Sequence, residues 1–252
     1  MIVNLDWQLG LALVLLVTVA VLSSLRGGYK QEGDVVVAAS RAALQLAAVS
    51  VVIVFCLQHL WAASLFCLLM FAVAVRTTVK RTAAGNAWPW TALAMLCGVV
   101  PVLAIIFGTG TSPFSGAALV PIAGIVIGNM MTAHTLFGRR QFACLRENFP
   151  GYEAALSIGL QRPEAIKLVT ESTAREALVP NLDTTRTVGL VTLPGAFVGV
   201  LLGGGSALQA GAAQVLVLVG IMAGQSVTVV MANELMQRGL LLPADLRERL
   251  HV

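Results

Sequence analysis

The chain has 252 residues, of which 58% are hydrophobic and only 11% are charged. Soluble domains carry about 25% charged residues, so this composition excludes a soluble globular protein and indicates a polytopic membrane protein. The formal net charge is +4, but the basic residues stand at the ends of apolar runs, where they set membrane topology. We therefore expect membrane lipid, and no nucleic acid, as a partner.

Seven apolar runs of membrane-spanning length predict an all-α integral membrane protein with seven transmembrane helices in one domain, residues 1–252. The runs cover about Trp7–Leu25, Val35–Leu57, Trp61–Val79, Trp88–Phe107, Ala117–Phe137, Thr187–Leu202 and Leu208–Ala232. The first run follows no basic segment and is too long for the core of a signal peptide, so we expect it to remain as a span.

The positive charges predict the orientation of these spans. With seven crossings, all sixteen Lys and Arg residues fall on one side of the membrane. The positive-inside rule then places the N-terminus outside and the C-terminus in the cytoplasm, in a multi-pass protein of the cell (inner) membrane.

One long hydrophilic segment, residues 139–186, interrupts the apolar pattern and is predicted to be a cytoplasmic loop. The stretch from Arg139 to Pro194 holds seven of the sixteen Lys and Arg residues and six of the twelve Asp and Glu residues. Its periodicity predicts short helices lying under the membrane, which suit docking to a soluble protein.

Prolines and glycines set the expected boundaries of these loop helices. The fifth run should continue as a helix through Arg139–Phe149 and break at Pro150-Gly151. Glu153–Gly159 is expected as a short helix that ends at glycine. Pro163 fits the first turn of a further helix, which Pro180 should stop.

The runs lack the chemistry of a self-powered pump or an enzyme. No Asp, Glu, Lys or Arg stands near the middle of any run, whereas proton-coupled carriers need ionisable groups at depth. No GxxxxGK[ST] motif for nucleotide phosphates occurs. We expect no catalytic residues in this chain, so uphill transport would draw its energy from another protein.

The fifth run contains polar and sulfur-bearing residues that form a candidate solute path: Asn129, Met130, Met131 and His134. Thioether and imidazole groups suit soft and borderline cations. The alternative is that the methionines fill packing gaps and the histidine lies at the cytoplasmic interface. Whether these residues bind a metal stays open at this point.

Uncharged amides form a second group inside the runs, at Gln45, Gln214 and Gln225. Each is able to line a pathway, as we suggest for Gln45, or to hydrogen-bond between helices.

Small residues predict where helices pack closely or move against each other. Glycines four residues apart let another helix approach, and the proline before the second series should break or kink the sixth run. The residues concerned are Gly124, Gly128, Pro194, Gly195, Gly199 and Gly203.

Four stretches together resemble the FetB-type ABC transporter permeases, a family that includes an iron export subunit and plant aluminium-tolerance permeases. They are PIAGIVIGNMM (121–131), EAALSIGLQRPEA (153–165), ALVPNLDTTRTVGLVTLPG (177–195) and GGGSALQAGAAQ (203–214).

The resemblance implies a homodimeric permease driven by a separate cytoplasmic ATPase, which would bind the ATP and Mg²⁺. EAALSIG is similar to the cytoplasmic coupling loop of ABC importers, which docks on the ATPase. Carried over, this similarity makes Glu153, Ala154, Ala155 and Gly159 coupling candidates, with Arg162 and Glu164 beside them.

The sequence departs from the family pattern beside the sixth run. Relatives have a methionine pair after the Pro-Gly of that run, then a glutamine, and a proline in the next loop. This chain has Ala196, Phe197, Val200 and Ala207 at those places. The departures bear on which solute is carried.

The resulting expectation is an ABC permease subunit that exports iron or another metal and serves metal homeostasis. Three alternatives are a permease for a nucleotide-sugar or other organic solute, a stand-alone secondary carrier and a seven-span receptor. An odd number of spans fits poorly with the two equal inverted repeats of many carriers.

Overall fold

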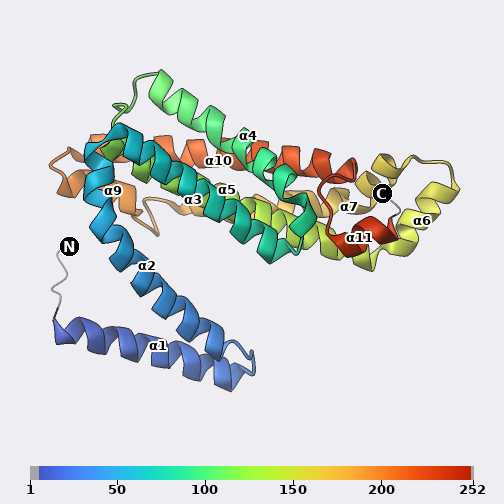
Figure 1. Ribbon diagram of the computed structural model, residues 1–252, viewed down its shortest axis with the longest axis horizontal. Helices are drawn as coiled ribbons and strands as arrows, with labels where there is room; N and C mark the ends of the chain where they lie inside the picture. The colour runs from blue at the N-terminus through green and yellow to red at the C-terminus, as the bar shows by residue number, and fades with distance from the viewer. Residues whose placement is uncertain (1–5, 251–252) are drawn as a thin grey trace. The chain divides into compact units, whose positions relative to one another are not determined.

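The computed structural model describes residues 6–250, and every regular element in that range is a helix (Figure 1). The only β contact within residues 6–250 is an isolated bridge between Val188 and Thr192. The expectation of an all-α protein is confirmed. The helices are α1 (Trp7–Gly27), α2 (Glu32–Gln58), α3 (Leu60–Thr82), η1 (Gly85–Ala87), α4 (Trp88–Gly108), α5 (Gly116–Glu147), α6 (Phe149–Ser157), α7 (Arg162–Ala174), η2 (Arg175–Ala177), α8 (Val179–Thr187), α9 (Gly195–Leu202), α10 (Ala207–Gln237) and α11 (Ala244–Arg249).

In the described part of the chain, six helices are long and apolar enough to cross a membrane: α1, α2, α3, α4, α5 and α10. The hydrocarbon core of a bilayer is about 30 Å thick, which a helix of about 20 residues crosses. These helices correspond to six of the seven predicted runs, and they make the chain a multi-pass membrane protein.

The helices form two compact units, one ending at Gln58 and the other beginning at His59. In the first unit, α1 and α2 form a hairpin. Gly28 takes the left-handed conformation (φ 66°) that ends α1, and the Ser24 hydroxyl donates to the Glu32 carboxylate at 3.1 Å. Most apolar side chains of this hairpin point outward, as expected for helices that face lipid.

The second unit is built around α3, α4, α5 and α10, which pack against one another. Helices α4 and α10 approach most closely at Gly98 and Gly224. A Cβ atom added to Gly98 would lie 2.5 Å from the Gly224 carbonyl oxygen. The fully buried side chain of Met130, from α5, fills the space beside this crossing.

Helix α5 is 32 residues long, which corresponds to about 48 Å. It therefore runs well past a bilayer core, as the sequence predicted. Its far end carries a lobe of short helices: Gln141 Nε2 donates to the Thr170 carbonyl on α7 at 3.3 Å, and Arg146 pairs with Asp245 of α11 at 2.7 Å.

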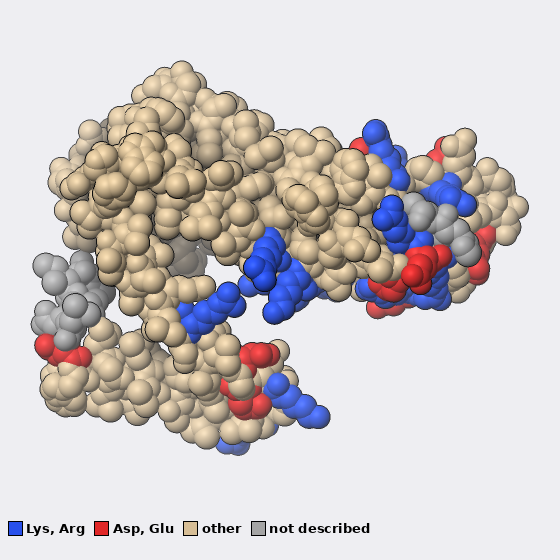
Figure 2. Space-filling model, viewed as in Figure 1, with Lys and Arg blue, Asp and Glu red and all other residues tan. Residues whose placement is uncertain are grey.

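Charged residues gather at this end of the second unit. Figure 2 shows Lys, Arg, Asp and Glu side chains over the region of α6, α7 and α11, while the visible face near the α4–α5 loop shows none. The sequence agrees, because residues 82–138 and 187–233 contain no Asp, Glu, Lys or Arg. The unit thus has one charged end and a long uncharged body.

The predicted sixth span, Thr187–Leu202, is not a continuous helix. Helix α8 ends at Thr187, an irregular segment follows, and α9 begins at Gly195. Gly189 has a positive φ of 84°, and Pro194 cannot donate a backbone hydrogen bond. With only eight residues, α9 extends about 12 Å, so it does not cross a bilayer alone.

Two loop-helix boundaries also differ from the prediction. The chain breaks at Asn148, one residue before α6, and Pro150 lies in the first turn of α6 because that turn needs no proline N–H. Likewise, α7 already ends at Ala174, and Pro180 lies in the first turn of α8. The expected helices before Gly159 and after Pro163 are confirmed.

Candidate functional site

An open cavity of about 530 Å³ lies in the second unit between α5, α10 and the segment that contains α8 and the start of α9. One wall comes from α5, another from α10, and the third from the residues between Ala177 and Ala196. The lining residues are Ile125, Asn129, Thr132, Ala133, Leu136, Ala177, Pro180, Asn181, Thr184, Pro194, Gly195, Ala196, Gln214, Val217, Leu218, Ile221 and Gln225.

A second cavity of about 890 Å³ lies between α5, α9 and α10 at the end of α5 where the α4–α5 loop lies. It shares Ile125, Gly195, Ala196 and Val217 with the first cavity. The two cavities therefore meet at the first turn of α9. Together they follow α5 from Ala117 to Leu136, which corresponds to about 28 Å of helix.

The segment from α8 to α9 accompanies α5 along this path. Ala177 lines the first cavity with Leu136, whereas Gly199 lines the second with Ala118. The chain therefore returns along α5 as two short helices joined by irregular backbone. Neither α8 nor α9 has a fully buried residue, so the second unit covers this segment only in part.

Hydrogen bonds orient the polar side chains of the first cavity. Gln225 Nε2 on α10 donates to the Asn129 carbonyl on α5 at 3.2 Å. Because a carbonyl accepts only, this bond fixes the amide orientation and leaves Gln225 Oε1 without a partner. Gln214 Oε1 is also buried and unpartnered.

On the α5 wall, an amide and a hydroxyl donate hydrogen bonds to backbone carbonyls of α5 itself. Asn129 Nδ2 donates to the Ile125 carbonyl at 2.9 Å, and the Thr132 hydroxyl donates to the Gly128 carbonyl at 3.0 Å. These two side chains therefore donate within α5, and none of the residues that line the cavity is charged.

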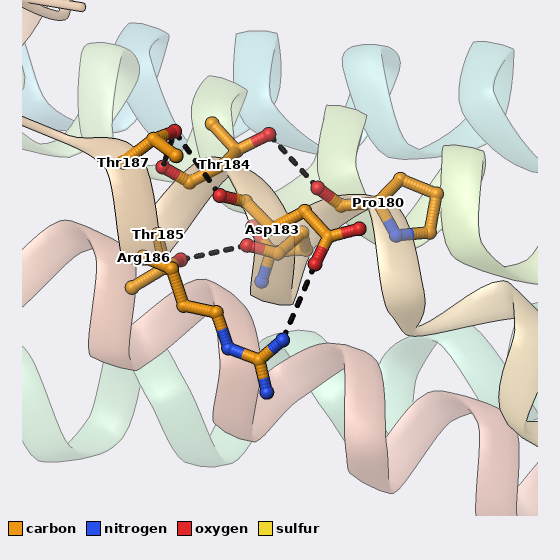
Figure 3. Close-up of polar contacts among 7 residues, drawn as sticks. Pro180, Asp183, Thr184, Thr185, Arg186 and Thr187 are labelled. Carbon is orange, nitrogen blue, oxygen red and sulfur yellow. Dashed lines mark hydrogen bonds and ion pairs between the residues drawn. The ribbon is translucent and has the colours of Figure 1, made fainter. Parts of the chain in front are cut away.

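Helix α8 is polar, and its hydroxyls bond to its own backbone (Figure 3). Thr184 and Thr185 donate to carbonyls four residues earlier, each at 2.8 Å. Asp183 and Arg186 form an exposed ion pair at 3.4 Å. Each of these four polar side chains therefore has a hydrogen-bond or ion-pair partner within α8 itself.

The structure separates the proposed pathway residues of α5. Asn129 lines the cavity, whereas Met130 and His134 are fully buried and do not line it. Met130 lies against Gly98 of α4 and Gly224 of α10. Met131 is half-buried and does not line the cavity. Gln45 lies exposed on α2 in the first unit.

Sequence reasoning missed the contribution of Asn181 and Thr184 to the cavity, because both stand in the segment assigned to the cytoplasmic loop. It left the role of Gln214 and Gln225 open. A charge-free stretch with isolated amides was the available signal, but only folding shows which of these amides share a cavity.

The six glycine and proline residues that were predicted where helices pack or move against each other have different surroundings. Gly124 packs against α3, since an added Cβ would lie 2.8 Å from Met70 Cε, whereas Gly128 has free space. Gly195 and Gly199 also have free space at the Cβ position, and they line the cavities. Pro194 caps the start of α9, and Gly203 ends that helix.

Two of the four family departures named from the sequence lie at the cavities. Ala196 lines both, and Val200 lines the larger one. The small and aliphatic side chains at these two positions therefore leave apolar wall where methionine or glutamine would place sulfur or amide groups.

The proposed coupling residues lie on or next to the α6–α7 turn. Glu153, Ala154, Gly159, Arg162 and Glu164 are exposed, while Ala155 packs into the lobe. Gly159 has φ 93°, a left-handed conformation that allows the tight turn. The Glu164 carboxylate accepts from the Gln161 N–H at 2.9 Å and fixes the start of α7.

Comparison with known proteins identifies the family of this chain. The family model described as "Uncharacterised protein family (UPF0014)" matches residues 6–241. The chain belongs to the UPF0014 family. The chain is 30% identical to the UPF0014 membrane protein YjkA of Bacillus subtilis over 208 residues, which cover 81% of this chain and 83% of that protein.

Two further relatives have names that refer to metals. The probable iron export permease protein FetB of Escherichia coli is 29% identical, with 92% of this chain and 90% of the relative covered. The protein Aluminum Sensitive 3 of Arabidopsis thaliana is 28% identical, with 82% and 77% covered. No solved structure matches the chain. The resemblance to the FetB-type family is therefore confirmed.

Proposed function

We propose that this chain is the membrane-spanning permease subunit of an ABC transporter and that it exports a metal ion such as iron. ATP and Mg²⁺ bind to a separate cytoplasmic ATPase. The observation that carries the proposal is the pair of cavities along α5. Helix α8 lines the first of them and follows directly after the charged lobe. The names of the E. coli and Arabidopsis relatives support a metal as the solute.

The proposed topology has seven crossings, with the N-terminus outside and the C-terminus in the cytoplasm. Six crossings are continuous helices, and the segment from α8 to α9 makes the remaining one. Its path beside α5 supports this arrangement. Broken helices that border a cavity are a recurrent way to place backbone groups beside a transported solute.

The lobe is suited to transmit motion from an ATPase to the cavity wall. In the α6–α7 turn, Ile158 is 76% exposed, and Glu153 of α6 is exposed as well. An exposed large apolar side chain within a charged lobe favours protein docking. Helix α7 continues through η2 into α8, so a displacement of α7 would move α8 and change the cavity.

The permease is proposed to act as a homodimer. The irregular segment between α8 and α9 exposes Leu190, Val191 and Leu193, at 92%, 75% and 62%. Irregular backbone at membrane depth is stable only where protein covers it or water fills a cavity beside it. A second copy against this segment would provide the cover, with the cavities between the copies.

Disulfide cross-linking tests the homodimer. In a variant without the four natural cysteines, Val191→Cys should form a covalent dimer under mild oxidation in membranes. A cysteine at Leu208, which is also exposed but lies in the first turn of α10, serves as the comparison. Equal cross-linking at both positions, or none at residue 191, would argue against the proposed contact.

Co-purification with the ATPase tests the coupling role. The full-length chain is expressed with the candidate P-loop ATPase, and complex formation and metal efflux from vesicles are measured. Ile158→Asp and Glu153→Arg should each reduce both at least tenfold. Glu248→Arg, a charge reversal on exposed α11 of the same lobe, should leave both near wild type.

Transport of other solutes tests the alternatives. Unchanged complex formation and efflux in both lobe variants would reject the coupling role. ATP-independent uptake by this chain alone would instead favour a secondary carrier. ATP-dependent transport of a nucleotide-sugar, without metal transport, would favour the organic solute.

A further inference from the structure

The first cavity contains the features of a binding site that uses only neutral groups. Gln214 and Gln225 are 6% and 4% exposed, and each has an Oε1 atom that is buried without a partner. Both residues line the cavity. A buried polar oxygen without a partner is costly, so two of them on residues of one helix that line one cavity indicate a ligand that donates hydrogen bonds.

Three further polar side chains of the cavity are consistent with this requirement. Asn129, Thr132 and Thr184 each donate to a backbone carbonyl. A hydroxyl that donates in this way keeps its oxygen lone pairs available as acceptors. The walls from α5, α8 and α10 therefore all present oxygen atoms to a ligand.

The first turn of α9 offers the opposite kind of group. Gly195 and Ala196 line the cavity and begin this helix. The first N–H groups of a helix have no partner within it, and the helix dipole adds partial positive charge at this end. A ligand held between α10 and α9 would donate on one side and accept on the other.

Side chains that coordinate metals directly are not part of this cavity. Its lining includes no carboxylate, imidazole, thiolate or thioether. Met130 and His134 are fully buried and do not line the cavity. Across the described residues, no group of three His, Cys, Asp or Glu side chains is placed to hold a metal ion.

The size of the cavity also allows more than a bare ion. A water molecule occupies about 30 Å³, so an ion with six waters needs roughly 200 Å³. The cavity has about 530 Å³. It therefore has room for a metal ion together with a complete shell of water or of a small carboxylate ligand.

We infer that the cavity lined by Gln214 and Gln225 binds the exported metal through the ligands that the ion brings with it. The amide oxygens accept hydrogen bonds from water on the metal, and the first turn of α9 binds any anionic ligand. This inference rests on the proposed export of a metal. The protein atoms touch the outer surface of the complex, so the ion never exchanges its shell for protein ligands and leaves easily.

Electron paramagnetic resonance with Mn²⁺ tests the inference on the purified full-length chain in lipid nanodiscs. Mn²⁺ is titrated alone and with one equivalent of citrate. Bound Mn²⁺ should show exchangeable water protons and no coupling to imidazole nitrogen. Gln214→Leu and Gln225→Leu should each weaken binding at least tenfold, while Gln214→Glu should strengthen it at least tenfold by adding a negative charge.

Gln237→Leu is the matched control, because it makes the same change on α10 outside the cavity, and it should bind as wild type. Gln214 makes no hydrogen bond that holds helices together, so its variants should fold even if Gln225→Leu does not. Tighter binding with citrate would place an anion at α9, and equal binding would identify the hydrated ion as the ligand; both support the inference.

Three results would overturn it: nitrogen coupling to the bound ion, loss of binding in Met130→Leu or His134→Leu with the glutamine variants unaffected, or no Mn²⁺ binding at millimolar concentration. ATPase co-purification is measured on the same preparations. If the ATPase binds but Mn²⁺ does not, this inference alone fails. If Mn²⁺ binds but no ATPase does, the proposed ABC function fails.

Discussion

Gly98 on α4 and Gly224 on α10 face each other where the two helices cross, and neither position has room for a side chain. A Cβ atom on Gly98 would contact Thr228 Oγ1 and lie 2.5 Å from the Gly224 carbonyl oxygen. A Cβ atom on Gly224 would lie 3.0 Å from the Gly98 carbonyl oxygen. In lipid, where no hydrophobic effect drives helices together, such close backbone packing is a main source of helix association.

Gly98→Ala should therefore destabilise the second unit. The added methyl group meets backbone that cannot rotate away, and overpacking of this kind costs about 1–3 kcal/mol. Thermal unfolding in detergent should show a lower Tm. Gly211→Ala on α10 is the control, because its Cβ would meet nothing within 4 Å; its Tm should stay the same or rise. Equal effects of both substitutions would contradict the packing argument.

Gly159→Ala should disturb the α6–α7 turn. The residue has φ 93°, and a side chain in a left-handed conformation costs about 1–2 kcal/mol. We expect faster proteolysis within residues 149–174 and weaker ATPase co-purification. Gly151→Ala is the comparison, since its Cβ would lie at an ordinary 3.8 Å from Val169 Cγ2. Wild-type proteolysis of Gly159→Ala would show that the turn tolerates a side chain.

The ion pair between Asp245 and Arg146 should give a small pH-dependent stabilisation. A hydrogen bond from the Arg146 side chain holds the pKa of the Asp245 carboxyl below its ordinary value of 3.8. A lowered folded-state pKa gives stability that is present above about pH 4 and is lost as the pH falls through the lowered value. Both side chains are substantially exposed, so the pair should contribute at most about 1 kcal/mol.

Comparing the Tm of wild type and Asp245→Asn from pH 7 to pH 3 checks this effect, because other titrations cancel in the difference. The wild type should be slightly more stable at pH 7, and the difference should shrink at the acidic end. Asp183→Asn, in the other exposed aspartate pair, is the parallel measurement. A difference that grows toward acidic pH would contradict the sign.

The proposed orientation predicts which cysteines a membrane-impermeant reagent reaches. In a cysteine-free background, Ser112→Cys in the α4–α5 loop should react in intact cells, whereas Ile158→Cys should react only after the cells are opened. The charged end would then be cytoplasmic, as the positive-inside rule requires. The reverse pattern would invert the topology and remove the proposed ATPase contact.

Most of the fold could be predicted from the sequence, because apolar runs long enough to cross a bilayer have few other stable structures. The continuation of α5 beyond its apolar part also followed from local periodicity. The sixth run was predicted less well. Its hydropathy resembles a span, and the predicted break at Pro194 is confirmed. The irregular backbone from Val188 to Leu193, with a positive φ at Gly189, was not predicted, because hydropathy does not record it.

The candidate site was predictable only in part. Asn129 was named and lines the cavity, whereas Met130 and His134, from the same motif, turn into the helix bundle. Adjacent helix positions point in directions about 100° apart, so a motif places residues near each other without deciding which neighbour each one faces. Asn181 and Thr184 join the site because α8 folds back along α5.

The sequence by itself determined that the chain folds in a lipid bilayer, at which end its charges gather and that a lobe extends from α5. The reason is that the cost of placing a charge in hydrocarbon depends on each residue alone. Only the tertiary structure decided that Gly98 meets Gly224, that the glutamine residues with unpartnered oxygens line one cavity and that α8 lies along α5. These features depend on which distant segments come into contact, and contact is a property of pairs of segments.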